Sequence, residues 1–163
     1  MEIRKTETAD LNAVMAVYRS AQDFMAGHGN PSQWGTFYPE RSLIESDIKE
    51  GTSYVCTEGG QIAAVFTFRV GPDATYARIY DGHWLDDAVY GVVHRIASSH
   101  IVRGSASFCI EWAFRQCGNI RIDTHRDNIP MQHLLQKLGY TYCGIIHTYD
   151  GTGRLAYQKT TVR

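Results

Sequence analysis

The sequence predicts a mixed α/β fold in which helices cover both faces of one sheet. Three observations support this prediction. Residues 91–140 alternate strand-like and helical patterns in the order strand, loop, helix, strand, helix, which is typical of a parallel strand pair joined by a helix. Two earlier strand-like runs meet at the glycine pair 59–60, which is a hairpin signal. Two further strand-like runs close the chain around a turn at residues 149–153.

The length and composition fit one domain spanning residues 1–163. Apolar residues make up 44% of the chain and charged residues 20%, so we do not expect disorder. The formal net charge of −1 gives no support for nucleic-acid binding. The first ten residues are charged, and no apolar run approaches the length of a membrane span. We therefore expect a cytoplasmic protein that binds neither nucleic acid nor a membrane.

The cysteines and histidines show no metal-binding pattern. Cys56, Cys109, Cys117 and Cys143 are scattered without C-x-x-C spacing, and the histidines lack the spacing of metal ligands. We therefore expect reduced thiols and no metal site. The sequence leaves open whether the chain is a monomer or a homodimer.

The chain is expected to begin with a strand and a helix. Residues 2–5 have a strand-like pattern. Thr8 is a candidate helix cap, and the apolar residues of 11–25 follow helical spacing. The glycines within 27–29 are expected to end this helix.

A second helix and a hairpin follow. The capping box from Ser42 to Glu45 predicts a short helix over residues 42–50, which the next glycine ends. Residues 53–57 and 61–70 are predicted to be the two strands of the hairpin.

The second half of the chain contains the alternating unit and the closing strands. Its predicted elements are a strand at 91–97, a helix at 108–117, a strand at 119–124, a helix opened by Asp127-Asn128, and strands at 140–146 and 155–160. The segment 76–87 is rich in aromatic and acidic residues and is expected to be mostly loop, with a strand at its start. Its acids either attract a cationic acceptor or belong to a solvated loop.

Small residues precede the helix that begins near Phe108. Gly104 and Ala106 carry little or no side chain, so an anion can approach their backbone closely. The first amides of a helix have no partner within it, and the helix dipole adds partial positive charge there. Such an end can receive a phosphate or diphosphate. A plain turn is the alternative explanation.

This unit resembles the GNAT superfamily of acyl-CoA-dependent N-acetyltransferases. The matching segments stand in the family's order: His94-Arg95-Ile96-Ala97, Gly104-Ser105-Ala106, Ile122-Asp123-Thr124-His125, Asn128 and Lys137-Leu138-Gly139-Tyr140. The resemblance implies a GNAT-like fold with a mostly antiparallel, splayed central sheet flanked by helices. It also implies a gap where the central strands part, near Ala97 and Thr124.

The resemblance further implies acetyl-CoA as co-substrate. In the family, amides at the end of the first central strand pair with the pantetheine arm and supply oxyanion donors, and the loop amides hold the diphosphate. The implied coenzyme-binding residues are Ile96, Ala97, Ser98, Arg103, Gly104, Ser105, Ala106, Ser107, Phe108 and Asn128. Arg103 either adds charge to the phosphate or is a solvated surface arginine. Asn128 contacts the coenzyme, caps the last helix, or does both.

The acceptor is expected to lie near the loop of residues 30–39, because the family's acceptor site adjoins the connection after the first helix. Gln33, Trp34 and Tyr38 are therefore candidates to line an amine pocket. Alternatively, Trp34 and Phe37 cover the edge of the sheet.

Two departures from the family pattern bear on activity. Ile101 stands at the usual Arg/Gln position of the loop, and Arg103 lies next to the glycine instead. Leu135 stands where many members carry a tyrosine that protonates the leaving thiolate. Tyr140 or Tyr142 either replaces that acid or simply packs.

His125 and Asp123 are the candidate catalytic residues. Histidine titrates near neutrality, and His125 ends the second central strand beside the expected gap. Asp123 lies two residues earlier and would share its face, so an Asp-His pair could raise its basicity. Alternatively, Asp123 bonds the backbone and His125 forms a turn. His94 is a weaker candidate, since it alternates with apolar residues of a packed layer.

The sequence therefore predicts an N-acetyltransferase that acts on a primary amine of a small molecule or peptide, by direct attack in a ternary complex. A second hypothesis is a catalytically weak acyl-CoA-binding module of the same fold, acting as a sensor or partner. A third is a nucleotide-phosphate protein unrelated to coenzyme A. The identity of the amine is not readable from the sequence.

Overall fold

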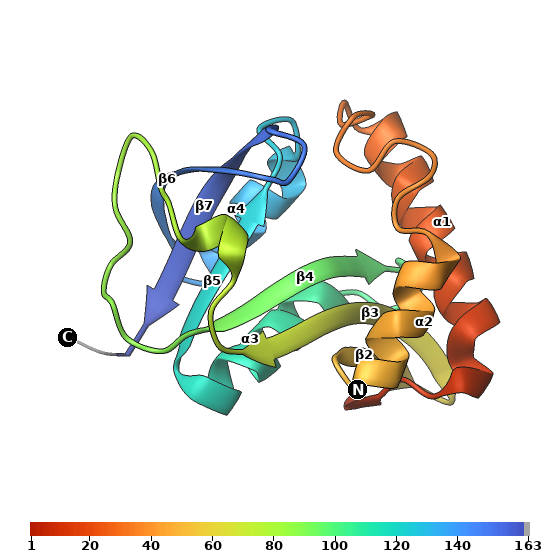
Figure 1. The fold of residues 1–163 in the computed structure, drawn as a ribbon. Coiled ribbons are helices and arrows are strands. Elements are labelled where there is room, and N and C mark those ends of the chain that lie inside the picture. The colour runs from red at the N-terminus through yellow and green to blue at the C-terminus, as the bar shows by residue number, and fades with distance from the viewer. Residues whose placement is uncertain (162–163) are drawn as a thin grey trace. The chain divides into compact units, whose positions relative to one another are not determined.

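The structure, a computed structural model, describes residues 1–161. Figure 1 labels its main helices and strands. The elements of the first half are β1 (Glu2–Lys5), the 3-10 helix η1 (Thr8–Asp10), α1 (Leu11–Gly27), α2 (Arg41–Glu50), β2 (Ser53–Glu58) and β3 (Gln61–Val70). Those of the second half are the 3-10 helix η2 (Ala74–Tyr76), β4 (Gly91–Ser98), α3 (Ser105–Cys117), β5 (Asn119–Thr124), α4 (Ile129–Lys137), β6 (Thr141–His147) and β7 (Gly153–Thr160).

The strands form one mixed sheet in the order β1-β2-β3-β4-β5-β7-β6. The pairs β1–β2, β2–β3, β5–β7 and β6–β7 are antiparallel. The pair β4–β5 is parallel, with Gly91 opposite Ile120 and Val92 opposite Arg121. The fold class predicted from the sequence is therefore confirmed, including the helix-linked parallel pair and the closing hairpin.

The β2–β3 hairpin forms at the predicted glycine pair. Gly59 and Gly60 have φ angles of 58° and 79°. A two-residue turn whose residues both have positive φ matches the twist of the strands, and glycine adopts this backbone without steric cost.

The residues group into two compact units, each built from separate stretches of the chain. The first unit comprises Met1–Phe68 and His94–Ile110, and the second comprises Arg69–Val93 and Glu111–Arg163. Strands β3 and β4 and helix α3 therefore each contribute residues to both units. The single domain expected over residues 1–163 stays a prediction.

Each unit has its own apolar core. In the first, the buried face of α1 packs with Ile44 of α2, Val55 and Val65 of the hairpin, and Ala97 of β4. In the second, a smaller cluster contains Tyr76, Tyr90, Val92, Ile146 and Ala156. Each fully buried aliphatic or aromatic side chain of this size contributes about 1.5–3 kcal/mol to folding.

Two predicted helix starts are wrong in detail. The N-cap of α2 is Glu40, so Ser42 lies inside the helix and the predicted capping box does not form. At the first helix, Thr8 lies inside η1, and the carboxylate of Asp10 accepts a 2.8 Å hydrogen bond from the Glu7 amide. Both segments still enter a helix within two residues of the predicted position, because the apolar spacing that follows is unaffected.

The strand expected at the start of segment 76–87 is also wrong. Residues 74–76 form η2. Between residues 77 and 90 the structure has one isolated β-bridge, from Tyr80 to Ile145. None of the helices within residues 1–161 is long and apolar enough to cross a membrane.

Candidate functional site

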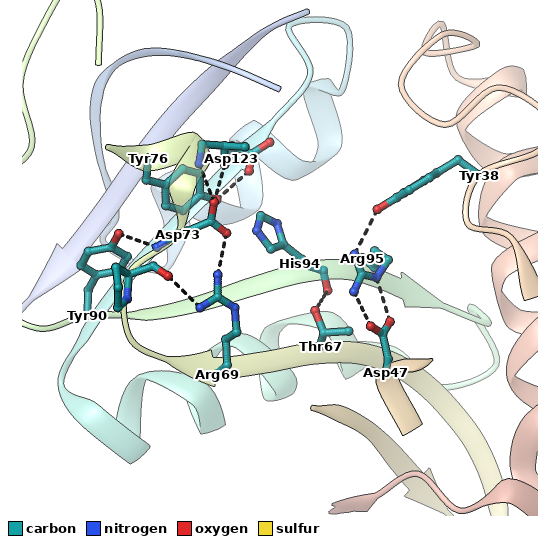
Figure 2. Close-up of polar contacts among 12 residues, drawn as sticks. Tyr38, Asp47, Thr67, Arg69, Asp73, Tyr76, Tyr90, His94, Arg95 and Asp123 are labelled. Atoms are coloured by element: carbon teal, nitrogen blue, oxygen red, sulfur yellow. Dashed lines mark hydrogen bonds and ion pairs between the residues drawn. The ribbon is translucent and has the colours of Figure 1, made fainter. Parts of the chain in front are cut away.

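Strand β4 has an irregular backbone at Arg95. This residue has φ +50°, a left-handed conformation that is uncommon for a side chain of this size. The carbonyl of His94 accepts a 3.1 Å hydrogen bond from Thr67 Oγ1 (Figure 2). The carbonyl of Arg95 accepts one of 2.9 Å from Tyr18 OH. Two successive carbonyls of the strand are thus bonded by side-chain hydroxyls. Local irregularities of this kind re-aim a strand next to functional sites. Here the irregularity directly precedes Ile96, Ala97 and Ser98, the predicted coenzyme strand.

The loop after β4 is held at several points within the first unit. The amide and hydroxyl of Ser99 both donate to the carbonyl of Ala63 on β3, at 2.9 and 3.1 Å. The hydroxyls of Ser98 and Ser105 are 2.9 Å apart, which joins the end of β4 to the start of α3. The loop is therefore fixed before it reaches the helix.

The predicted diphosphate receptor lies where this loop enters α3. Gly104 has φ +81°, and a Cβ built on it would meet no atom within 4 Å, so the backbone stands open on that side. The first helical bond runs from the amide of Phe108 to the carbonyl of Gly104 at 3.0 Å. Ser105, Ala106 and Ser107 therefore occupy the first turn, where amides and helix dipole favour an anion. Helix α3 begins three residues earlier than predicted, which brings these residues into the helix N-terminus.

The remaining coenzyme candidates differ in their surroundings. Arg103 is exposed, as either of its two predicted roles requires. Asn128 is the N-cap of α4, and its Oδ1 accepts a 3.2 Å hydrogen bond from the Met131 amide. The capping role of Asn128 is confirmed, and its contact with the coenzyme stays a prediction.

The acceptor candidates lie in the loop between α1 and α2, in the first unit. Trp34 packs against the apolar core and meets the rings of Tyr18 and Tyr38 edge-on, at 5.8 and 6.0 Å between centroids. Gln33 accepts a 2.8 Å hydrogen bond from the Asn30 side chain. Phe37 is 82% exposed, so it does not cover the sheet edge as the alternative explanation required. The roles of Gln33, Trp34 and Tyr38 toward an acceptor stay predictions.

An ion pair that the sequence gave no sign of links α2 to β4, and its arginine also bonds to this loop. The Nη2 and Nε of Arg95 donate to the two carboxylate oxygens of Asp47, at 2.6 and 3.0 Å, and Nη1 donates to Tyr38 OH at 3.2 Å (Figure 2). Burial raises the pKa of Asp47, although the Arg95 guanidinium acts in the opposite direction. A buried carboxylate with bidentate arginine contact is the arrangement in which such a pair is best satisfied.

In the second unit, Asp123 of β5 is bound by a tyrosine. Tyr76 OH donates to Asp123 Oδ1 at 2.6 Å (Figure 2). Burial, and then the charge of Asp123, raise the pKa of Tyr76, so the hydroxyl keeps its proton and acts as donor. Trp84 Nε1 donates to the Tyr76 carbonyl at 3.0 Å, and the two rings are 5.3 Å apart. The carboxylate therefore has a fixed hydrogen-bond donor.

His125 follows β5 and is buried. Its Nδ1 accepts a 3.0 Å hydrogen bond from the Asp127 amide and lies 3.5 Å from Asp127 Oδ2. Burial, and then the charge of Arg154, lower the pKa of His125. An acceptor at Nδ1 assigns the proton of the neutral ring to Nε2. Asp123 is therefore bonded to Tyr76, and His125 to Asp127. The catalytic roles of Asp123 and His125 stay predictions.

The position of the family's usual acid and the two tyrosines that could replace it have different surroundings. Leu135 lies in α4 with no exposed surface. Burial raises the pKa of Tyr140, and its hydroxyl has no hydrogen-bond partner, so the choice between its two predicted roles stays open. Tyr142 is about half exposed. All four cysteines are free thiols, and residues 1–161 contain no group of three or more side chains suited to a metal.

The mixed sheet, with a glycine-bearing loop and a helix N-terminus directly after its irregular central strand, is the arrangement that the resemblance to the GNAT acyltransferases implied. Comparison with solved structures identifies the family. The chain is similar to a GNAT-family acetyltransferase from Streptococcus agalactiae 2603, with 35% identity over 99% of this chain and 96% of that one and a TM-score of 0.90. The chain belongs to the GNAT family of acetyltransferases.

More distant structures share the fold. An acetyltransferase from Staphylococcus aureus MU50 is 22% identical, with 98% of this chain and 99% of that one covered and a TM-score of 0.70. The ribosomal-protein-S18-alanine N-acetyltransferase of Escherichia coli is 16% identical, with 98% and 92% covered and a TM-score of 0.65. No protein-family model matches the sequence, and a search of curated proteins gave no match.

Proposed function

We propose that this protein transfers an acetyl group from acetyl-CoA to a primary amine of a small molecule or peptide, in a ternary complex and without an acyl-enzyme. One observation carries the proposal. The first unit builds an open, left-handed Gly104 into the N-terminus of α3, directly after a strand whose backbone departs from regular geometry at Arg95. A diphosphate at this helix end would orient the thioester along β4.

The coenzyme would be held mainly by backbone groups. Amides of residues 103–107 would bind the diphosphate, because the Phe108 amide already donates to the Gly104 carbonyl, and Arg103 would add charge to it. Amides of Ile96, Ala97 and Ser98 would pair with the pantetheine arm and supply donors to the oxyanion. Side-chain identity matters little for amide donors. Ile101 in place of the usual Arg/Gln is therefore compatible with binding.

The reaction requires three proton and charge steps. The amine nitrogen attacks the thioester carbon, the tetrahedral oxyanion collapses, and the carbon–sulfur bond breaks to give the amide and a thiolate. The ammonium must lose one proton before attack, the nitrogen must lose a second proton after attack, and the thiolate must gain one as it leaves. We assign proton acceptance to the carboxylate of Asp123, directly or through water, because Tyr76 orients it.

His125 takes a different role from the general base that the sequence predicted. Its Nδ1 already accepts the Asp127 amide, so the neutral ring presents its proton at Nε2. We propose that this N–H acts as a proton donor in the reaction. Because Leu135 replaces the usual tyrosine, the thiolate otherwise leaves unassisted, with a thiol pKa near ~8.5 if cysteine is the guide.

A matched pair of substitutions at Gly104 tests the coenzyme site. Asparagine and aspartate have similar size, and both tolerate a left-handed backbone. We expect Gly104→Asp to abolish acetyl-CoA binding in calorimetry, because its charge repels the diphosphate, and Gly104→Asn to retain much more affinity. Equal, wild-type affinity in both variants would contradict the assignment.

Turnover is tested by thiol release over a panel of amines and peptides with the wild-type protein. Release above the hydrolysis background with any amine supports the enzyme. Tight coenzyme binding without turnover would instead favour the binding module. Competition by ATP but not by coenzyme A would favour an unrelated nucleotide-phosphate protein.

A further inference from the structure

Arg95 connects three segments of the first unit to strand β4. Its guanidinium binds Asp47 of α2 through two nitrogens, and it binds Tyr38, in the loop between α1 and α2, through the third. Its carbonyl accepts the hydroxyl of Tyr18 on α1. Helix α1, helix α2 and the loop between them are therefore all bonded to one residue of the strand (Figure 2 shows the contacts of its guanidinium with Asp47 and Tyr38).

The backbone of Arg95 indicates that these contacts determine its conformation. A left-handed residue with a long side chain costs free energy and persists only where its surroundings impose it. Glycine would adopt φ +50° more readily. The presence of arginine is explained if the side chain has a task that glycine cannot perform.

The geometry of the ion pair requires arginine. Asp47 is bound by two parallel N–H groups, and the third nitrogen reaches a different partner at the same time. Lysine offers a single ammonium and cannot bind a carboxylate and a tyrosine in this planar arrangement. Because the side chains of Arg95 and Asp47 are only 17% and 6% exposed, the pair also loses little to screening by water.

Tyr38 is the member of this cluster that lies on the acceptor side. Its hydroxyl accepts from Arg95, its carbonyl accepts a 2.7 Å hydrogen bond from Gln22 of α1, and its ring meets Trp34. Tyr38 is 38% exposed, so it is both held and accessible. Movement of Arg95 would therefore release the part of the loop that carries the candidate pocket residues.

We propose that Arg95 is a positioning residue for the amine acceptor. Bonded to Asp47, it holds Tyr38 and the loop between α1 and α2 at a fixed place relative to residues 96–98, the predicted coenzyme-binding end of β4. The inference rests on the proposed function, since it assigns the loop to the acceptor. It adds that the Arg95 side chain determines the affinity for the amine and the order of preference among amines. Affinity for the coenzyme does not depend on this side chain.

Steady-state kinetics with the full chain tests this. Arg95→Lys keeps the charge but loses the paired contact, and Arg95→Gly keeps the left-handed backbone without strain but removes the side chain. In both, we expect KM for the best amine of the wild-type panel to rise roughly ten-fold, the equivalent of one charge-assisted hydrogen bond. KM for acetyl-CoA should change less than about two-fold, because the Arg95 side chain contacts Asp47 and Tyr38, neither of which is a candidate coenzyme residue.

Tyr38→Phe and Arg4→Lys complete the design. Tyr38→Phe removes only the hydroxyl from a partly exposed side chain, and it should reproduce the rise in amine KM even if the Arg95 variants fold poorly. Arg4→Lys is the matched control. It breaks another two-point arginine–aspartate contact of the same unit, from Arg4 to Asp10 at 2.7 and 3.0 Å, and should leave both KM values unchanged.

The outcomes separate the two proposals. A wild-type protein that binds coenzyme but turns over no amine refutes the proposed function. A wild-type enzyme whose Arg95 and Tyr38 variants keep the amine KM and the ranking among amines refutes the positioning role alone. A parallel rise in both KM values would also count against it, since that result describes a general loss of structure.

Discussion

The hydroxyl of Tyr76 donates a 2.6 Å hydrogen bond to the carboxylate of Asp123. The two residues are 47 positions apart in the chain, and Tyr76 is only 1% exposed. The rings of Trp84 and Tyr90 lie 5.3 and 6.4 Å from that of Tyr76, between centroids. A carboxylate at the end of a central strand is thus held by a donor that the core itself fixes in place.

Replacing Tyr76 with phenylalanine should destabilise the protein and lower its turnover. The change removes one hydrogen bond to a charged group, which costs about 1.5–3 kcal/mol. Urea unfolding gives the loss of stability, and thiol release gives the loss of turnover if Asp123 accepts the proton. Tyr149→Phe is the control, because Tyr149 is 89% exposed. If Tyr76→Phe turns over at the wild-type rate, the reaction does not depend on the orientation of Asp123 by Tyr76.

The stability of the protein should fall with pH below neutrality because of His125. Burial lowers the pKa of this ring in the folded state below its ordinary value of about 6.5. As the pH falls through 6.5, the unfolded chain binds a proton before the folded one, so the free energy of unfolding decreases. The contribution is complete above the unfolded pKa and is lost as the pH approaches the folded pKa.

Urea unfolding at a series of pH values between 5 and 7.5 measures this effect. His125→Gln should show a shallower dependence on pH than the wild-type protein. His133→Gln, at an exposed position of α4, should keep the wild-type dependence. Identical slopes in all three proteins would mean that His125 is not held neutral by its surroundings.

A methyl group at Gly82 should be strongly destabilising. A Cβ at this position would overlap the carbonyl oxygen of Cys143 and lie 2.8 Å from its carbonyl carbon. These are backbone atoms of β6, so they cannot rotate away, and we expect Gly82→Ala to cost more than about 3 kcal/mol. Thermal unfolding measures the loss.

Gly151→Ala is the matched comparison in the same unit. Gly151 has φ +83° with no atom within 4 Å of a built Cβ, so its substitution carries only the left-handed backbone penalty of about 1–2 kcal/mol. A smaller loss at Gly82 than at Gly151 would show that the segment 77–90 is not held against β6.

The elements that could be predicted from the sequence are those with local signals. Strand β5 begins and ends at the predicted residues, Asn119 and Thr124, and α4 follows the Asn128 cap. The loop and helix around Gly104 carry a recognisable order of small residues. In contrast, Ser42 fits a capping pattern, but Glu40 is the residue whose backbone is extended at the helix start.

The contacts that fix the candidate site could not be predicted in this way. Arg95 and Asp47 are 48 positions apart, and each looks like an ordinary charged residue in its own segment. Tyr76 lies in a segment without periodicity, and its partner is decided by how that loop packs. Such pairs depend on tertiary arrangement, which no local pattern of the chain encodes.

The division of the chain into interleaved stretches has a practical consequence. The boundaries fall after Phe68, Val93 and Ile110, so each unit needs two pieces of polypeptide that are not neighbours in sequence. No single backbone cleavage yields either unit as one intact fragment free of the other's residues. A gene split at any one codon therefore gives halves that must recombine, and a protease nick in the 77–90 loop should leave two fragments that copurify.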